Sequence, residues 1–271
     1  MRYWYVFIVV CVFFSAVLVW DGSFEKEEGV YFISVGQGDG AYLTYQGRRF
    51  LIDVGKDDHV FSYINEMIEG VRFIDGIFIS HNQYDHMGGL TRIIRTFPIG
   101  FIAFSSPPLA EMKSLCRMHS IACVVLSQGD RIEGENMSIR VLWPPGEDVM
   151  RDLNEASLVL HVTLGNLRIL FTGDITASVE EELVELYGER LFSHVLKIPH
   201  HGSAYSSSPL FLKAVSPQVS VVSVGENSYG HPAAYVEDIV GEIGSVLFRT
   251  DRDGTISVWW EGDELRVITE R

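Results

Sequence analysis

Two imidazoles and one carboxylate stand within six residues in the segment His81-Asn-Gln-Tyr-Asp85-His86. The segment directly follows residues 73–79, an apolar run that is typical of a buried strand. Imidazole and carboxylate together suit zinc, manganese or iron(II). A polar loop with a helix-capping Asp85 is the simpler alternative, but so many donors in one short stretch favour a metal centre. Gly88 and Gly89 then allow a helix to begin close against it.

The rest of the chain predicts the elements that must position these residues. We expect strands at residues 30–35, 41–45, 49–53, 73–79, 99–104, 121–125, 138–143, 157–164, 167–172, 194–198, 219–222, 245–249 and 255–260. We expect helices near residues 60–68, 90–96, 109–119 and 177–187. Strands followed by strand and helix alternation, twice over, predict an α/β fold with two packed mixed sheets and helices outside.

The N-terminus carries a separate signal. Residues 3–20 contain no charge and are long enough to cross a bilayer. Arg2 precedes this run and acidic residues follow it, so we expect the N-terminus in the cytoplasm and the domain exported. We predict a membrane anchor or signal at residues 1–21, a tether at 22–29 and one folded domain at 30–271. We favour an uncleaved transmembrane helix over a cleaved signal, which would give a secreted protein, because Ser15-Ala16-Val17 is a poor cleavage site.

The formal net charge of −15 limits the kinds of partner. Proteins that hold nucleic acids by neutralising phosphates are usually basic, so tight non-specific DNA binding is disfavoured. Bound divalent cations would reverse the sign locally, and a nuclease therefore stays possible.

The cysteines carry less information. Cys116 and Cys123 lie seven positions apart, without the spacing of a metal or redox motif. A disulfide between them is one interpretation. We favour the other, two small buried apolar side chains.

The first motif resembles the HxHxDH motif of the metallo-β-lactamase superfamily. It is more similar to the HxDxDHxGG motif in the hydrolase domain of the ComEC family of DNA-uptake channel proteins. Further blocks match in order: Val35-Gly-Gln-Gly-Asp39, Asp53-Val-Gly55, Asn154-Glu-Ala-Ser-Leu-Val-Leu160, Leu170-Phe-Thr-Gly-Asp174, Leu196-Lys-Ile-Pro-His-His-Gly-Ser203, Tyr229-Gly-His-Pro232 and Thr250-Asp-Arg-Asp-Gly254. The resemblance covers almost everything from Val30 onward and implies an αββα sandwich.

The resemblance also implies the metal ligands. His81 would bind the first metal, and Asp85 and His86 the second. Asp174 stands at the position of the family's metal-bridging Asp. The cofactor would be one or two divalent ions, zinc or manganese.

A histidine of the pair His200-His201, just past a predicted strand, would complete the second site. We favour His200, because it is nearer to the strand end, while His201 stays open. His161 lies inside a predicted strand, where a packed neighbour is the more common role than a ligand.

Two departures from the family pattern concern the first site. Gln83 stands where the superfamily has His and the ComEC-like branch has Asp, and a neutral amide is a weak ligand. The superfamily's third-motif histidine is also missing. We therefore expect a weakened first site, with occupancy by a single metal as an alternative.

Other residues are expected to lie beside the metals or to contact the substrate. They are Asp39, Asp53, Ser157, Lys197, Ser203 and Arg252. His231 could bind a metal, contact a phosphoryl oxygen or protonate a leaving group. Asp85 or Asp174 could hold the proton during transfer.

The implied function is metal-dependent hydrolysis of a phosphodiester, DNA above all, in a ComEC-like competence or DNA-uptake role. A separate membrane channel protein would then be a partner. One alternative is hydrolysis of another ester or amide, such as a lactone or a β-lactam, since the fold hosts many chemistries. The other is a non-catalytic binding domain with a degenerate metal site.

Overall fold

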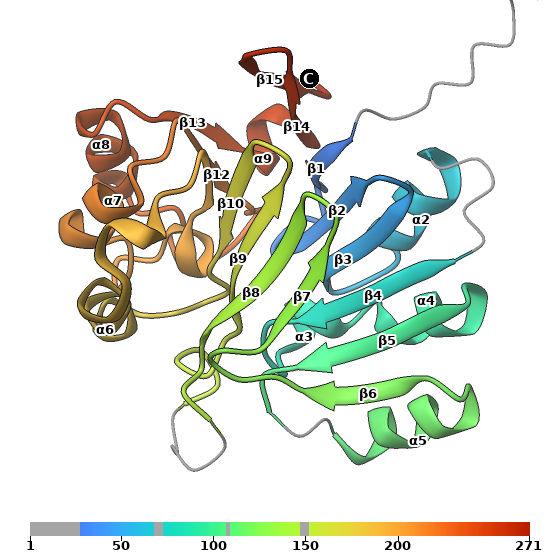
Figure 1. Ribbon diagram of the computed structural model, residues 1–271. Helices are drawn as coiled ribbons and strands as arrows, with labels where there is room; N and C mark the ends of the chain where they lie inside the picture. Colours follow the sequence, from blue (N-terminus) through green and yellow to red (C-terminus); the bar gives the residue numbers. More distant parts are fainter. Residues whose placement is uncertain (1–27, 68–72, 107–108, 147–151) are drawn as a thin grey trace, which may run out of the picture.

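Two mixed β-sheets pack face to face in the computed structural model, which describes residues 28–67, 73–106, 109–146 and 152–271 (Figure 1). The first sheet runs in the order β15-β14-β1-β2-β3-β4-β5-β6. Its strands are β1 (Gly29–Phe32), β2 (Gly40–Tyr45), β3 (Arg48–Val54), β4 (Ile74–Ile79), β5 (Ile99–Phe104), β6 (Ala122–Val125), β14 (Ile256–Glu261) and β15 (Glu264–Thr269). Strands β3 to β6 are parallel, and the others pair antiparallel.

The second sheet runs in the order β13-β12-β11-β10-β9-β8-β7. Its strands are β7 (Arg131–Gly134), β8 (Met137–Trp143), β9 (Val159–Leu164), β10 (Leu167–Phe171), β11 (Val195–Lys197), β12 (Val219–Val222) and β13 (Val246–Arg249). Strands β10 to β13 are parallel. Each sheet therefore has a parallel half, whose strands point their carboxyl ends the same way.

Helices cover both outer faces, so the predicted layering is confirmed. Apolar residues of α2 (His59–Met67), α4 (Leu90–Thr96) and α5 (Ala110–Met118) pack against the first sheet. Those of α6 (Ala177–Tyr187), α7 (Pro209–Val215) and α8 (Ala234–Glu242) pack against the second. Two short helices, α3 (Tyr84–Met87) and α9 (Thr250–Asp253), lie at strand ends.

The core between the sheets joins the two halves of the chain. Phe32 of the first sheet and Phe171 of the second have ring centroids 5.7 Å apart and are both buried. Truncating a buried phenylalanine of this kind costs about 3–5 kcal/mol, because the cavity is only partly refilled. The contact thus fixes the sheets against each other.

The preference for two separate buried cysteines is wrong, because Cys116 and Cys123 form a disulfide. Helix α5 ends at Met118 and β6 begins at Ala122, so the chain turns back within three residues. Their Cα atoms are 6.4 Å apart, which a disulfide spans.

The predicted membrane anchor, residues 1–21, lies outside the described residues. Within the described ranges, no helix is both long and apolar enough to cross a bilayer. The first described element is β1, which lies at the start of the predicted folded domain.

Candidate metal centre

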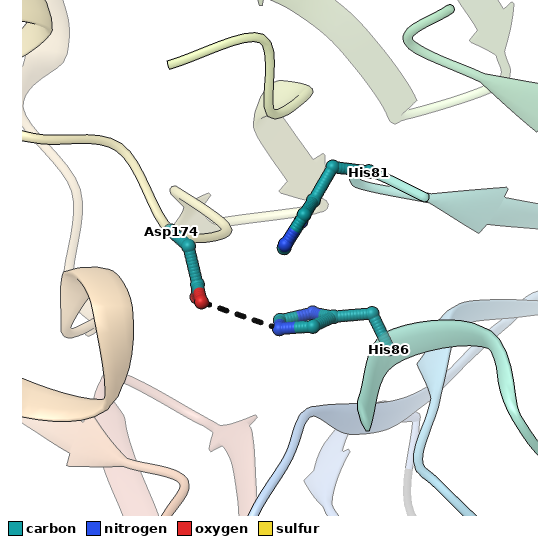
Figure 2. Close-up of side chains that lie close together, drawn as sticks. All are labelled: His81, His86 and Asp174. Atoms are coloured by element: carbon teal, nitrogen blue, oxygen red, sulfur yellow. Dashed lines mark ion pairs between the residues drawn. The ribbon is translucent and has the colours of Figure 1, made fainter. Parts of the chain in front are cut away.

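The predicted metal motif begins where β4 ends. His81 follows the strand by two residues, and His86 lies on α3, whose short turn brings it back toward the strand end. Asp174 follows β10 of the second sheet, and its N–H donates to Ser157 Oγ at 3.1 Å in the segment before β9. The Leu158 N–H of the same segment donates to the Ser80 carbonyl at 2.8 Å, which joins it to the loop after β4. Figure 2 shows the side chains of His81, His86 and Asp174 converging on one point.

Three buried residues, His81, His86 and Asp174, form the first donor group, with one ligand atom of each within 4.8 Å of the others. His86 Nε2 lies 3.4 Å from Asp174 Oδ2. A second group consists of Asp85, His86 and His201. The groups share His86, so the donors form one continuous cluster.

Several donor atoms in this cluster are buried and lack a hydrogen-bond partner among the described residues. They are Nε2 of His81, His86 and His201, and Oδ1 of Asp174. A buried polar atom without a partner is costly, and native proteins satisfy nearly all of them. Imidazole nitrogens and a carboxylate oxygen left unpaired in adjoining donor groups fit the coordination of divalent cations.

The second ring nitrogen, Nδ1, of His86 and of His201 is held by a hydrogen bond to the protein. His86 Nδ1 donates to Asp53 Oδ2 at 2.9 Å, and His201 Nδ1 donates to the Ser223 carbonyl at 2.8 Å. Asp53 also accepts from the N–H and the hydroxyl of Ser80, both at 2.7 Å. When these imidazoles are neutral, the two bonds keep the proton on Nδ1 and leave Nε2 as the acceptor, as in known metal sites. Asp53 therefore lies against the back of the His86 ring, at a distance suited to orienting it.

The charges of the cluster are strongly coupled. Burial, together with His86, lowers the pKa of His81 to about 4. Burial opposes charge on His86 and His201 too, but Asp174 acts together with Asp53 on His86 and with Asp39 on His201. These carboxylates jointly outweigh burial and hold the pKa of both histidines well above the ordinary value. The pKa of Asp174 is well below its usual value, since burial raises it less than His201 and His86 lower it. The carboxylates thus draw positive charge to this point.

The structure places His201, and not His200, in the cluster. His201 Nε2 lies 3.4 Å from Asp174 Oδ2 and 3.5 Å from Asp85 Oδ2, whereas His200 Nε2 is 3.9 Å from Asp174. His200 lies at the rim, with its side chain 22% exposed. Both residues have positive φ, 49° and 52°, and this left-handed turn rotates the second imidazole inward. The geometry therefore favours His201 over His200, which the distance from the strand end had favoured.

Gln83 lies beside the centre without entering a donor group. Its Nε2 donates to Asn154 Oδ1 at 2.6 Å, across to the loop before β9. His161 lies elsewhere, with Nε2 3.3 Å from the carbonyl of Phe192. It occurs in none of the donor groups found among the described residues.

Four other residues singled out in the sequence are buried beside the donor cluster and contact it or its loops. Lys197 is buried and its Nζ lies 2.7 Å from Asp39 Oδ2, so it balances that carboxylate and does not face solvent. Asp39 Oδ1 lies 3.3 Å from His201 Nδ1. Ser157 Oγ accepts from the Asp174 N–H at 3.1 Å. Ser203 is buried beside the histidine turn, where its Oγ accepts from the Tyr205 N–H.

The glycine loop before β2 packs directly on the metal motif. Gly38 has φ 137°, and a Cβ there would lie 2.3 Å from the carbonyl oxygen of Asp85. The Asp39 N–H donates to the same oxygen at 3.2 Å. This loop needs glycine in order to hold Asp85 in place.

His231 stands at the outer edge of the centre. Its ring lies 5.6 Å from that of His200. Burial and the nearby His200 lower the pKa of His231, so it is neutral at pH 7. Asn227 fixes its loop, because Asn227 Oδ1 accepts from the N–H of His231 and Asn227 Nδ2 donates to its carbonyl. Sequence reasoning missed Asn227, although an Asn four residues before His231 in a glycine-flanked loop is a turn signal.

Comparison with known proteins gives consistent results. A family profile described as the metallo-beta-lactamase superfamily matches residues 145–226. Competence protein ComA of Neisseria gonorrhoeae is 34% identical over 235 residues, which are 86% of this chain and 32% of ComA. ComE operon protein 3 of Bacillus subtilis is 27% identical over 259 residues, covering 86% of this chain and 33% of that protein. The chain thus spans about a third of the length of these relatives.

Among solved structures, the metallo-beta-lactamase fold protein YhfI from Bacillus subtilis is similar, with a TM-score of 0.61. The match covers 88% of this chain and 100% of YhfI at 12% identity. At that identity the likeness concerns the fold alone.

Proposed function

The chain is a metallo-beta-lactamase-fold domain homologous to a segment of ComEC-type competence proteins, and on that premise we propose that it is a metal-dependent phosphodiesterase acting on DNA. One observation carries the proposal: three imidazole nitrogens and a carboxylate oxygen, all buried and without hydrogen-bond partners among the described residues, belong to adjoining donor groups that share His86 and Asp174. The ligand set we propose is His81, Asp85, His86, Asp174 and His201.

The chain's own residues have distinct parts in this mechanism. A divalent cation, zinc or manganese, would activate water and neutralise charge at the attacked phosphorus. Asp85 is the most accessible carboxylate of the cluster, with 29% of its side chain exposed, so it is placed to take the proton from the attacking water. Neutral His231, at the rim, is placed to contact a phosphoryl oxygen or the leaving group.

The biological setting is a further proposal. One relative is a competence protein by name, which supports a role in DNA uptake for this chain. In that role the domain would stand outside the membrane, anchored through residues 1–21, and would act beside a channel. The chain spans about a third of the length of these relatives. The proposed partnership with a channel therefore needs its own test, independent of the test of hydrolysis.

The test is hydrolysis by the purified full chain with zinc or manganese added. Bis(p-nitrophenyl) phosphate, a DNA oligonucleotide and a chromogenic β-lactam are compared, with metal content measured in the same samples. We expect metal-dependent cleavage of both phosphodiesters, and its loss in Asp174→Asn. Turnover of the β-lactam alone would indicate a different hydrolase. Bound metal without turnover of any substrate would indicate a binding domain.

A further inference from the structure

A row of aromatic rings leads from the metal cluster to the surface. The rings of His81 and His86 are 4.1 Å apart, and those of His86 and His201 are 5.4 Å apart. From His201 the row continues to His200 at 6.3 Å. His200 is followed by His231 at 5.6 Å, and His231 by Tyr229 at 5.7 Å. Burial decreases steadily along this row.

Tyr229 ends the row as an open ring. It is 75% exposed, and its plane is inclined by 32° to that of His231. Three quarters of this aromatic side chain face solvent, so one side of its ring is open to a ligand.

The loop that carries Tyr229 is held in a defined shape. Asn227 Oδ1 accepts from the Tyr229 N–H at 3.1 Å and from the His231 N–H at 3.0 Å. The Asn227 amide donates to the carbonyls of Gly225 and His231, both at 2.9 Å. Four hydrogen bonds from one side chain thus fix the backbone beneath an exposed ring, as a preorganised contact requires.

Two more exposed tyrosines lie on segments that also carry residues of the cluster. Tyr84 is 73% exposed and directly precedes Asp85. Tyr205 is 78% exposed, four residues after His201, and its carbonyl accepts from the Ala177 N–H in the loop after Asp174. These three tyrosines, each more than 70% exposed, therefore belong to segments that build the centre.

The charge of the chain limits how such a centre can hold a polynucleotide. With a formal charge of −15, it has little capacity to neutralise a phosphate backbone. Stacking of bases on aromatic rings does not depend on net positive charge, and it is tolerant of sequence. Bases in a duplex are already stacked on each other, so only unpaired bases are free to use such rings.

We propose that Tyr229 is a positioning residue that stacks an unpaired nucleobase beside the metal centre, so that the substrate is single-stranded nucleic acid. This inference rests on the proposed phosphodiesterase function. The ring row places the stacked nucleotide next to His231 and His200, with its phosphate directed toward the cluster. Tyr84 and Tyr205 provide further rings for neighbouring bases.

The experiment uses the full chain as purified and a single-stranded oligonucleotide that carries one 2-aminopurine. Rapid mixing records fluorescence quenching by stacking before cleavage occurs. Tyr229→Ala should weaken binding roughly five- to one-hundred-fold, the effect of losing one stacked base. Tyr229→Phe should restore both binding and quenching, because it keeps the ring. Phe73→Ala is the matched control: Phe73 is an exposed aromatic at the opposite end of β4, and its loss should change nothing.

Kinetics separate this inference from the proposed function. Tyr229→Ala should raise KM for the single-stranded oligonucleotide more than it lowers kcat. It should also affect that substrate several-fold more than bis(p-nitrophenyl) phosphate, which carries no nucleobase. Equal binding by wild type and Tyr229→Ala, or failure of Tyr229→Phe to restore it, would overturn the stacking role even if both phosphodiesters are cleaved. If wild type cleaves neither the oligonucleotide nor bis(p-nitrophenyl) phosphate, the proposed phosphodiesterase function is overturned. The quenching measurement would still test base stacking on Tyr229.

Discussion

At the scale of single residues, adjacent histidines have different surroundings. His200 and His201 both stand just past β11, yet the left-handed turn places one at the rim and the other in the buried cluster. The Ser223 carbonyl then fixes the inner imidazole through Nδ1. Distance along the chain does not contain this information. The orientation of His201 depends on the positive φ of the turn and on the Ser223 carbonyl, just past β12.

The two histidines should therefore differ in their effect on metal binding. His201→Ala removes a buried donor and should weaken metal affinity by at least roughly tenfold. Loss of a residue that only hydrogen-bonds to a metal ligand already costs about that much. His200→Ala should weaken it far less. Metal titration into chelator-stripped protein, with circular dichroism to check folding, measures both. An equal loss in the two variants would contradict the assignment.

Gln83 offers a second test at this scale. Gln83→Asp adds a carboxylate where the chain has a neutral amide, so it should raise the affinity of the first site for divalent cations. It also removes the hydrogen bond to Asn154, which costs about 1 kcal/mol of unfolding free energy. Gln83→Ala is the control, since it loses the same bond without adding charge. Identical metal titrations for Gln83→Asp and wild type would show that position 83 does not limit the site.

At the scale of elements, close backbone contacts position the donors. The glycine loop before β2 leaves no room for a side chain at Gly38, because the Asp85 carbonyl lies against it. The donors on α3 and in the β4 loop are therefore placed by a neighbouring loop as well as by their own strand.

Gly38→Ala should consequently lower both stability and metal affinity. The Cβ would collide with the Asp85 carbonyl, and its φ of 137° is unfavourable for alanine. Gly47→Ala is the matched control: φ is 73° there, but no atom lies within 4 Å of the added Cβ. The control should cost about 1–2 kcal/mol by backbone strain alone and leave metal affinity unchanged. Urea unfolding and metal titration compare them, and unchanged metal affinity in Gly38→Ala would refute the positioning role.

The disulfide gives another prediction for an element. Replacing both Cys116 and Cys123 with serine should lower the free energy of unfolding by roughly 2–3 kcal/mol, because the unfolded chain is no longer constrained by a short closed loop. Urea unfolding with and without a reducing agent measures this. Reductant should bring wild type to the level of the double variant and leave the variant unchanged. A wild type that is insensitive to reductant would show that the bond does not form in solution.

The sequence predicted most of the strands because apolar runs and glycine turns are local signals. It predicted α4 and α6, whose periodicity and helix ends are clear. It missed α7 and α8, and also the edge strands β7 and β15, whose half-exposed residues alternate with charged ones. The sequence pointed to the residues that the structure brings together because each of them follows a strand end. The roles of Asn227 and the Ser223 carbonyl could not be predicted, since they depend on which loops meet in space.

At the scale of the whole molecule, the donors come from both sheets. His81, Asp85 and His86 belong to the first sheet's loops, and Asp174 and His201 to the second's. A cation held by all of them would connect the two halves of the sandwich. Metal binding is then also folding free energy.

Metal removal should therefore destabilise the fold. At a free metal concentration one hundred times Kd, binding adds about 2.7 kcal/mol to the free energy of unfolding. In a domain of this size that corresponds to a Tm higher by roughly 5–10 °C. Thermal unfolding of chelator-stripped and metal-loaded protein tests this, and Asp174→Asn should lose the increase. A Tm that does not respond to metal in wild type would contradict a cation shared by both sheets.

The Phe32–Phe171 contact between the sheets has a consequence for ion selectivity. Asp174 stands three residues beyond Phe171, so a slight sliding of one sheet over the other would change the width of the donor cage. Preferred metal–ligand distances differ among divalent ions by only about a few tenths of an ångström. The distances between the donor atoms would then depend on the volume of apolar side chains that do not touch the metal. The same side chains would thereby determine the choice between zinc and a larger ion.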